Sequence, residues 1–163
     1  MDKSEVFMKR GFFRIFCLIC LFAVVSPLYA QMTKKQMQTM YVDYLKAEGY
    51  SPTIDDDGDV SFKKEGLTYY ILVNDADQEY FTIVHLNFWE IESKEELAQA
   101  YVAAVKATRD TKIADVFVRK DEKDVGIEAE IFINKPEDFK KFLDRLISSL
   151  QHARKLFIEE MKK

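Results

Sequence analysis

The sequence predicts a single α+β domain in which helices pack against an antiparallel sheet. Residues 49–89 alternate apolar and polar positions between Asp-Gly, Glu-Gly and Asn-Asp turns, which is typical of a strand meander. Helical spacing of apolar residues precedes and follows this stretch. The 163 residues are 48% apolar and 32% charged, as in one ordinary globular domain. The expected order is helix, strand meander, helix, two strands, helix.

The first predicted helix covers residues 34–48, and Gly49 stands where helices commonly end. Its apolar residues recur at helical spacing and are Met37, Met40, Tyr41, Tyr44 and Leu45. We interpret this stripe as core, although a methionine-rich face can also bind a partner or a metal.

The meander is expected to hold strands at residues 53–55, 60–63, 67–73 and 79–91. Residues 56–59, Asp-Asp-Gly-Asp, favour a tight turn because Gly and Asp tolerate positive φ angles. The aspartates also suggest a calcium loop. When Gly58 takes position 6 of such a loop, Lys64 takes position 12, where a bidentate Glu is required. We therefore interpret the segment as a turn, with calcium binding as a minor alternative.

The second predicted helix opens with Ser93 and Glu96 at the spacing of a capping box. One of its sides carries Leu97, Tyr101, Ala104, Val105 and Thr108, and the other is alanine-rich and could pack closely. Two strands, residues 113–120 and 125–134, precede a long last helix that begins near Pro136. The expected buried stripe of that helix is Phe139, Phe142, Leu143, Leu146, Ile147, Leu150, Ala153 and Phe157.

The longest strand, residues 79–91, is apolar on both of its alternating sets. One set holds Tyr80, Val84, Leu86 and Phe88, and the other holds Phe81, Ile83, His85 and Trp89. Because a sheet covered on one side needs only one apolar face, the surplus indicates either a second covering element or a binding surface. We expect a partner to bind the second set. With Tyr70, the candidate partner-binding residues are Tyr70, Phe81, Ile83, His85 and Trp89.

No catalytic constellation is found in the sequence. The two histidines, His85 and His152, lie far apart, no serine occupies a nucleophile elbow, and the glycines form no phosphate-binding loop. We therefore predict a non-enzymatic protein without cofactor or metal. The alternative is a small-ligand carrier with a pocket between the sheet and the second helix, around Tyr101 and Ala104.

Residues 1–30 have the pattern of a secretory signal peptide. A basic start is followed by an apolar run at residues 15–25 and by Ala30, after which we expect cleavage. This apolar run is shorter than the roughly 20 residues of a membrane-spanning helix. Met8, followed by two basic residues, is an alternative start of the chain. The predicted product is a periplasmic or secreted single domain of residues 31–163.

Cleavage changes the charge and the cysteine content of the chain. Residues 1–30 carry four basic side chains, two acidic side chains and both cysteines, so residues 31–163 keep 20 basic and 26 acidic side chains, a net charge of −6. A disulfide or a cysteine nucleophile is thereby excluded from the domain. An acidic, interspersed charge pattern also gives no reason to expect binding to nucleic acid or to an anionic membrane.

The meander and its flanks together resemble the YbjN-like domain, a family described as bacterial sensory-transduction regulators. This resemblance implies a fold related to the type III secretion chaperones and a role through protein contacts, and it carries over no catalytic residue. The predicted export distinguishes this chain from cytoplasmic members. We expect a chaperone-like or regulatory module that binds a protein partner or a second copy of itself. The matching segments are Gly49-Tyr50, residues 54–62, 65–70, 74–81 and 87–89, the end of the second helix, the last strand pair and residues 136–139.

Overall fold

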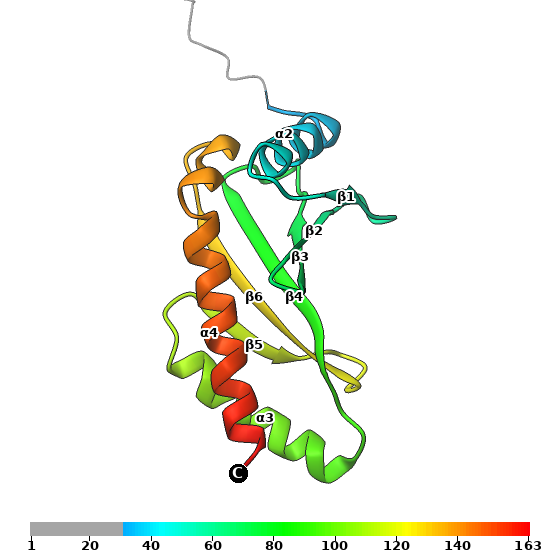
Figure 1. Cartoon of the computed structure of the whole chain (residues 1–163), viewed down its shortest axis with the longest axis vertical. Coiled ribbons are helices and arrows are strands. Elements are labelled where there is room, and N and C mark those ends of the chain that lie inside the picture. Colours follow the sequence, from blue (N-terminus) through cyan, green and yellow to red (C-terminus); the bar gives the residue numbers. More distant parts are fainter. Residues whose placement is uncertain (1–30) are drawn as a thin grey trace, which may run out of the picture. The chain divides into compact units, whose positions relative to one another are not determined.

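The computed structural model describes residues 31–163 (Figure 1). The predicted signal peptide lies outside the described residues. The α+β prediction and the order of elements are confirmed. The elements are α2 (Lys34–Ala47), β1 (Thr53–Ile54), β2 (Val60–Lys64), β3 (Leu67–Leu72), β4 (Tyr80–Glu90), α3 (Lys94–Arg109), β5 (Ala114–Val118), β6 (Asp124–Phe132), the 3-10 helix η1 (Pro136–Lys141) and α4 (Leu143–Met161).

The strands form one six-stranded sheet in the order β1-β2-β3-β4-β6-β5, and every neighbouring pair is antiparallel. The sequence dictates its tight turns. Glu65 and Gly66, between β2 and β3, both have positive φ angles, 53° and 80°, as a two-residue hairpin turn requires. Gly58 has a φ of 86° in the turn between β1 and β2. The Asp-Gly and Glu-Gly turns of the meander are therefore confirmed.

One face of the sheet, here called the covered face, carries the core. Helices α2, η1 and α4 pack on it, and α4 lies lengthwise along the strands (Figure 1). The rings of Phe81, Tyr41 and Phe139 form a cluster, in which the centroid of Phe81 lies 6.0 Å from that of Tyr41 and 5.5 Å from that of Phe139. The strand residues that are buried here are Val60, Phe62, Tyr69, Ile71, Phe81, Ile83, Ala114, Val116, Val125, Ile127 and Ala129. The opposite face, here called the open face, carries the residues that alternate with these.

A β-bulge changes the alternation near the end of β4. The register with β6 shifts between His85 and Trp89, and Asn87 has a φ of 54°. As a result, Phe88 and Trp89 both contact Phe157 of α4, with ring centroids 5.2 and 5.8 Å apart. The assignment of Phe88 to the face of Tyr80 is therefore wrong, because the bulge, in which β4 has two residues more than β6, brings Phe88 to the covered face.

The last helix is divided, where one long helix was expected. Residues Pro136–Lys141 form η1, and α4 begins only after Phe142, whose φ of −116° interrupts the helical backbone. A 3-10 helix has three residues per turn, so its apolar positions do not continue the stripe of an α-helix. Phe139 accordingly points into the core, whereas Phe142 is 36% exposed and does not belong to the buried stripe.

The alanine-rich side of helix α3 packs closely, as the sequence indicated. Ala100, Ala103, Ala104 and Ala107 are buried where α3 packs against α4 and β5, because small side chains allow the helix to approach closely. The larger residues on the outer side of α3 are exposed; they are Tyr101, Val102 and Val105. No helix in residues 31–163 has the length and apolar character needed to cross a membrane.

Candidate partner-binding surface

Four of the five predicted partner-binding residues lie on the covered side of the sheet. Phe81 and Ile83 are fully buried, and His85 is 7% exposed. The side chains of α2, η1 and α4 already fill the space over these residues. The expectation that a partner binds this set is therefore corrected, because these residues belong to the packed side of the sheet. The surplus apolar set of β4 is the one that contains Tyr80, Val84 and Leu86.

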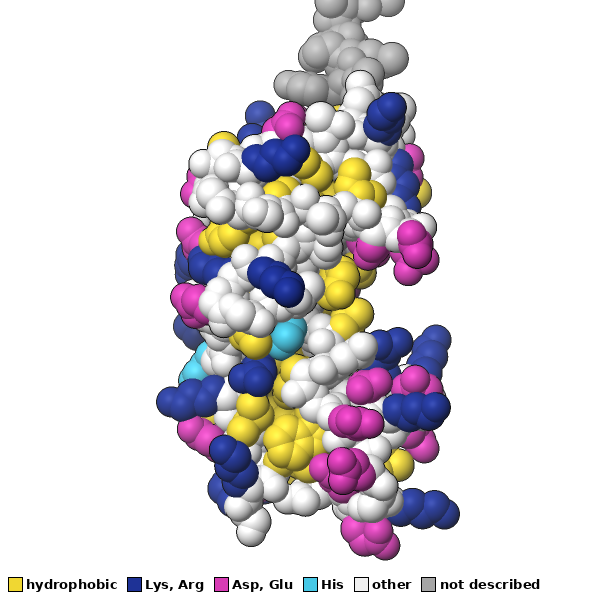
Figure 2. Space-filling model, turned by 45° about the vertical axis from the view of Figure 1, so that its right-hand side comes forward, with side chains coloured by type: hydrophobic (Ala, Val, Ile, Leu, Met, Phe, Trp, Pro, Cys, Tyr) yellow, Lys and Arg dark blue, Asp and Glu magenta, His cyan; other side chains and the backbone are white. Residues whose placement is uncertain are grey.

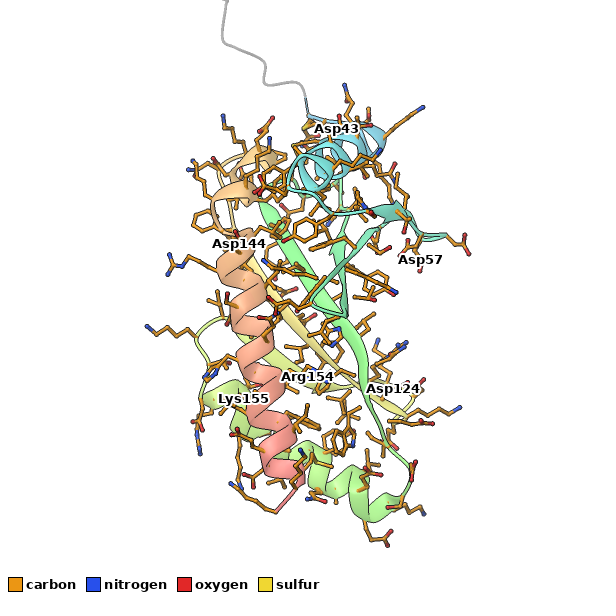
Figure 3. All side chains as sticks on the ribbon, viewed as in Figure 1. Asp43, Asp57, Asp124, Asp144, Arg154 and Lys155 are labelled. Carbon is orange, nitrogen blue, oxygen red and sulfur yellow. The ribbon has the colours of Figure 1, made fainter. Side chains whose placement is uncertain are left out.

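His85 has a structural role. Its Nδ1 lies 2.8 Å from the carbonyl oxygen of Thr68, to which it donates a hydrogen bond, and its ring lies between those of Tyr69 and Phe88. Burial lowers the pKa of His85, because a charged imidazolium would lose its hydration there, and the nearby Arg154 adds to this effect. Figure 3 shows Arg154 on α4, and its guanidinium lies 5.8 Å from the ring centroid of Phe88.

Trp89 joins the end of β4 to the start of α3. Its Nε1 donates a hydrogen bond to Oε1 of Glu96 at 2.9 Å, and the backbone N–H of Glu92 donates to the other oxygen of that carboxylate at 2.8 Å. Ser93 accepts from the backbone N–H of Glu96, so the helix start predicted from the sequence is confirmed. Trp89 is half-buried, and its ring packs against Phe157 at the border of the core.

Tyr70 is the one predicted residue that lies on the open face. The strand register continues from it across the sheet: Tyr70 is opposite Val84, Val84 is opposite Glu128, and Glu128 is opposite Asp115. Val84 is only 3% exposed, because the side chains around it on the strands shield it. The residues of the open face on β3, β4, β6 and β5 are Thr68, Tyr70, Leu72, Tyr80, Thr82, Val84, Leu86, Glu128, Glu130, Phe132, Asp115 and Phe117.

Phe132 is the most prominent apolar side chain of the open face. It is 83% exposed and lies opposite Tyr80, with ring centroids 5.3 Å apart. The hydroxyl of Tyr80 donates a hydrogen bond to Glu130, which raises the pKa of Tyr80 to about 12. Leu72 is 37% exposed on β3. In the sequence, Phe132 follows Glu128 and Glu130 at steps of two residues, and this alternation places it with them on the solvent side of β6.

At the other end of the open face, a glycine makes room for an aromatic ring. A Cβ atom at Gly126 would lie 2.6 Å from the ring of Phe117 and 3.2 Å from Leu86. Without a side chain at Gly126, the ring of Phe117 lies across β6 beside Leu86. The open face therefore has an apolar region at each end, Phe132 with Tyr80 and Phe117 with Leu86.

Three carboxylates separate the two apolar regions. Asp115 and Glu128 are opposite each other on β5 and β6, and Glu130 follows on the same face of β6. Partial burial raises the pKa of Glu128, and the charges of Glu130 and Asp115 raise it further. On the side of the molecule that Figure 2 displays, acidic and basic side chains are interspersed around apolar surface.

Both edges of the sheet are protected against the addition of another strand. The outer edge of β5 is capped by hydroxyl groups: Thr108 accepts from the backbone N–H of Val116 at 2.9 Å, and Thr111 donates to the carbonyl of Ala114 at 2.7 Å. The other edge strand, β1, has only two residues. A partner is therefore more easily accommodated on the open face than at an edge.

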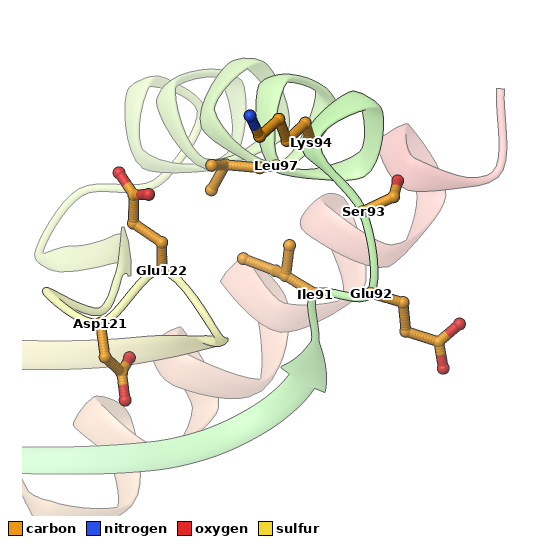
Figure 4. A pocket seen from close by; sticks show the side chains of 7 residues that line it. All are labelled: Ile91, Glu92, Ser93, Lys94, Leu97, Asp121 and Glu122. Atoms are coloured by element: carbon orange, nitrogen blue, oxygen red, sulfur yellow. The ribbon is translucent and has the colours of Figure 1, made fainter.

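The expected ligand pocket around Tyr101 and Ala104 is also corrected. Ala104 is buried in the helix packing, whereas Tyr101 is exposed and its hydroxyl lies 3.4 Å from Glu122. A shallow hollow of about 320 Å³ occurs at the start of α3, but neither residue lines it (Figure 4). Its lining residues are Ile91, Glu92, Ser93, Lys94, Leu97, Asp121 and Glu122.

The aspartates between β1 and β2 stabilise their turn. The backbone N–H of Asp59 donates to Asp55 at 2.8 Å, and the carboxylate of Asp59 accepts from the backbone N–H of Val73 at 2.7 Å. These contacts support the turn interpretation of the segment. Within residues 31–163, no group of three His, Cys, Asp or Glu side chains is placed to hold a metal ion.

The fold is similar to that of YbjN from E. coli, a proposed transcription regulator. The similarity has a TM-score of 0.55 at 11% identity and covers 74% of this chain and 88% of YbjN. An uncharacterized protein from Methanothermobacter thermautotrophicus aligns with a TM-score of 0.44 at 15% identity over 77% of this chain and 94% of its own. No family model matches the sequence, and no curated protein matches it. The chain therefore has a YbjN-like α+β fold, and at this identity the likeness concerns the fold alone.

Proposed function

We propose that this protein is an exported, non-enzymatic module that binds a partner protein through the open face of its sheet. The observation that carries the proposal is the 83% exposure of Phe132, at the end of strand β6 and beside the ring of Tyr80. Aromatic residues are enriched at the centres of protein interfaces, where they often account for much of the binding energy. Export rests on the sequence pattern of residues 1–30.

The positions of the titratable groups support a role without catalysis. His85 and Glu128 both have shifted pKa values, which is common at active sites. They lie on opposite faces of the sheet, His85 in the core and Glu128 on the open face. A general base and a nucleophile or acid must lie within hydrogen-bond reach of each other or of one substrate. These two groups cannot form such a pair.

Photo-crosslinking in the producing bacterium tests this function. A photoreactive phenylalanine analogue is placed at Phe132 of the full chain, and in a separate variant at Val105, which is 68% exposed on α3. We expect a discrete protein adduct from position 132 and a different pattern or none from position 105. Excess unlabelled protein should abolish the adduct, whereas excess Phe132→Ser protein should not. An adduct that is absent at 132, or that Phe132→Ser protein removes equally well, would contradict the proposal.

Self-association is a second candidate, favoured by the outer side of α3. Five exposed positions follow one another at steps of three and four residues, the spacing of a helix-pairing seam; they are Glu95, Ala98, Val102, Val105 and Arg109. If two copies paired antiparallel, the valines would meet and acidic Glu95 would face basic Arg109 of the second copy.

The cysteine content of the chain makes self-association simple to test. Residues 31–163 contain no cysteine, so a single Val102→Cys substitution supplies the only thiol of the exported protein. We expect air oxidation to give a disulfide-linked dimer with Val102→Cys but not with Lys155→Cys on α4. Light scattering should also give twice the monomer mass for the wild type. Equal oxidation of both variants would contradict pairing through α3.

A further inference from the structure

We propose that the segment bound by the open face is basic and amphipathic, with a Lys or Arg placed on Asp115, Glu128 and Glu130 and apolar residues on either side of it. This inference rests on the proposed function, because it specifies the chemistry of the partner that the open face binds. It follows from the strand register, the absence of a local counter-charge and the spacing of the two apolar regions.

The register concentrates negative charge at the centre of the open face. Asp115 and Glu128 are directly opposite each other on β5 and β6, and Glu130 lies two residues further along β6 on the same face. Like charges at directly opposite positions destabilise an antiparallel pair. Glu128 is also half-buried, so water screens its charge only in part.

The domain itself does not neutralise these carboxylates. The ion pairs in the described part of the chain involve the acidic residues Asp110, Asp138, Asp144, Glu159 and Glu160. On the open face, Glu130 accepts a hydrogen bond from the neutral hydroxyl of Tyr80. Lys63 lies on β2, which β3 and β4 separate from the carboxylates on β6. Partial burial raises the pKa of Glu128, and the charges of Glu130 and Asp115 raise it further. A cation from a partner would stabilise the ionised form of Glu128 and lower this pKa.

The apolar regions define the rest of the partner. Phe132 and Gly126, over which Phe117 lies, are six residues apart on β6, which corresponds to about 20 Å along a strand. Phe132 and Tyr80 lie at one end of this distance and Phe117 with Leu86 at the other, with the carboxylates between them. A segment that matches this surface has an apolar residue at each end and a basic residue near its middle.

The charges decide between this partner and a second copy of the chain. Two copies stacked with their open faces together would bring two sets of Asp115, Glu128 and Glu130 into the same apolar interface. Burying unpaired like charges costs several kcal/mol. The net charge of −6 on residues 31–163 adds a general repulsion between copies. A basic segment is attracted by the same charges.

The test uses a synthetic Leu/Lys peptide of about 14 residues, whose amphipathic helix would span about 20 Å. Binding to the exported full-length product is followed by fluorescence anisotropy. Two control peptides carry Glu for every Lys, or Ser for every Leu. We expect binding of the Leu/Lys peptide alone, and the double variant Glu128→Gln/Glu130→Gln should weaken it about tenfold, as for a partly desolvated charge pair. Glu137→Gln/Glu159→Gln, which removes two exposed carboxylates on η1 and α4, should leave it unchanged.

Further readouts separate the possible outcomes. NMR should show that the pKa of Glu128 falls when the Leu/Lys peptide binds, and that Phe132→Ser weakens binding without changing the fold. The inference is overturned if the Leu/Lys peptide does not bind, or if the Leu/Glu peptide binds equally well. It is also overturned if Glu128→Gln/Glu130→Gln leaves the binding of the Leu/Lys peptide unchanged. A wild-type dimer that Phe132→Ser dissociates would overturn it as well. If any of these occurs while the crosslink at position 132 persists, a partner still binds the open face but is not basic. Loss of that crosslink means that the proposed function itself fails.

Discussion

The two faces of β4 carry apolar side chains in similar number but are covered in different ways. Phe81 and Ile83 on the covered face have no exposed surface, and Phe81 contacts aromatic residues of α2 and η1. Val84 on the open face is nearly as well buried, but by neighbours on the sheet, and beyond it Phe132 is exposed. Burial of single residues therefore does not distinguish the core from the proposed binding surface. The charges on the neighbouring strand distinguish the two faces, because Glu128 and Glu130 both lie on the open side of β6.

The largest difference between the faces should appear in stability. Phe81→Ala removes a fully buried ring that contacts Tyr41 and Phe139, and should lower the free energy of unfolding by about 3–5 kcal/mol. Phe132→Ala removes a ring that is already in water and should change it by less than about 0.5 kcal/mol. Urea denaturation of both variants measures the contrast. Equal losses would mean that Phe132 supports the fold and that the open face is not free.

Gly126→Ala should have the next largest effect. The new Cβ would lie 2.6 Å from the ring of Phe117, so the ring must leave its place across β6. Overpacking of this kind costs about 1–3 kcal/mol. The double variant Gly126→Ala/Phe117→Ala should lose less stability than Gly126→Ala alone, because the clash is absent. If the double variant is the less stable of the two, Phe117 does not rest on Gly126.

The sequence predicted most of this architecture but not which face of β4 is covered. Its turns are determined locally, by Gly58 and by Glu65-Gly66, and its strands show alternation. Alternation identifies two faces, but the covering depends on contacts between β4 and helices far away in sequence. The strand register places Val84 opposite Glu128 and so puts Val84 on the face that carries the carboxylates. This register depends on the pairing of distant segments and cannot be read from the sequence of β4 alone. The bulge at Asn87 and the division at Phe142 also lack a clear local signal.

On the covered face, His85 should make stability depend on pH. Its pKa is lowered in the folded protein, so the unfolded chain binds the proton more readily. The contribution of neutral His85 to the free energy of unfolding is therefore fully present above the ordinary pKa of about 6.5. It falls as the pH decreases below that value, by about 1.4 kcal/mol for each pH unit between the pKa of the unfolded chain and that of the folded protein. His85→Phe, which keeps a ring between Tyr69 and Phe88, should remove this slope. Urea denaturation from pH 5 to 8 compares the slopes. His152→Phe, at an exposed position of α4, should keep the wild-type slope.

On the open face, Glu128→Gln should give the smallest effect and the opposite pH trend. The pKa of Glu128 is raised in the folded protein, so its ionised form opposes folding above the ordinary pKa, and this penalty disappears as the pH falls through the raised value. The substitution should stabilise the domain by a few tenths of a kcal/mol up to about 1 kcal/mol at pH 7, as expected for removing a like-charge pair, and by nothing in acid. Thermal unfolding at both pH values measures it, with exposed Glu137→Gln as the control. A loss of stability at pH 7 would show that Glu128 already has a cationic partner within the domain, and the argument for a basic partner would lose its electrostatic basis.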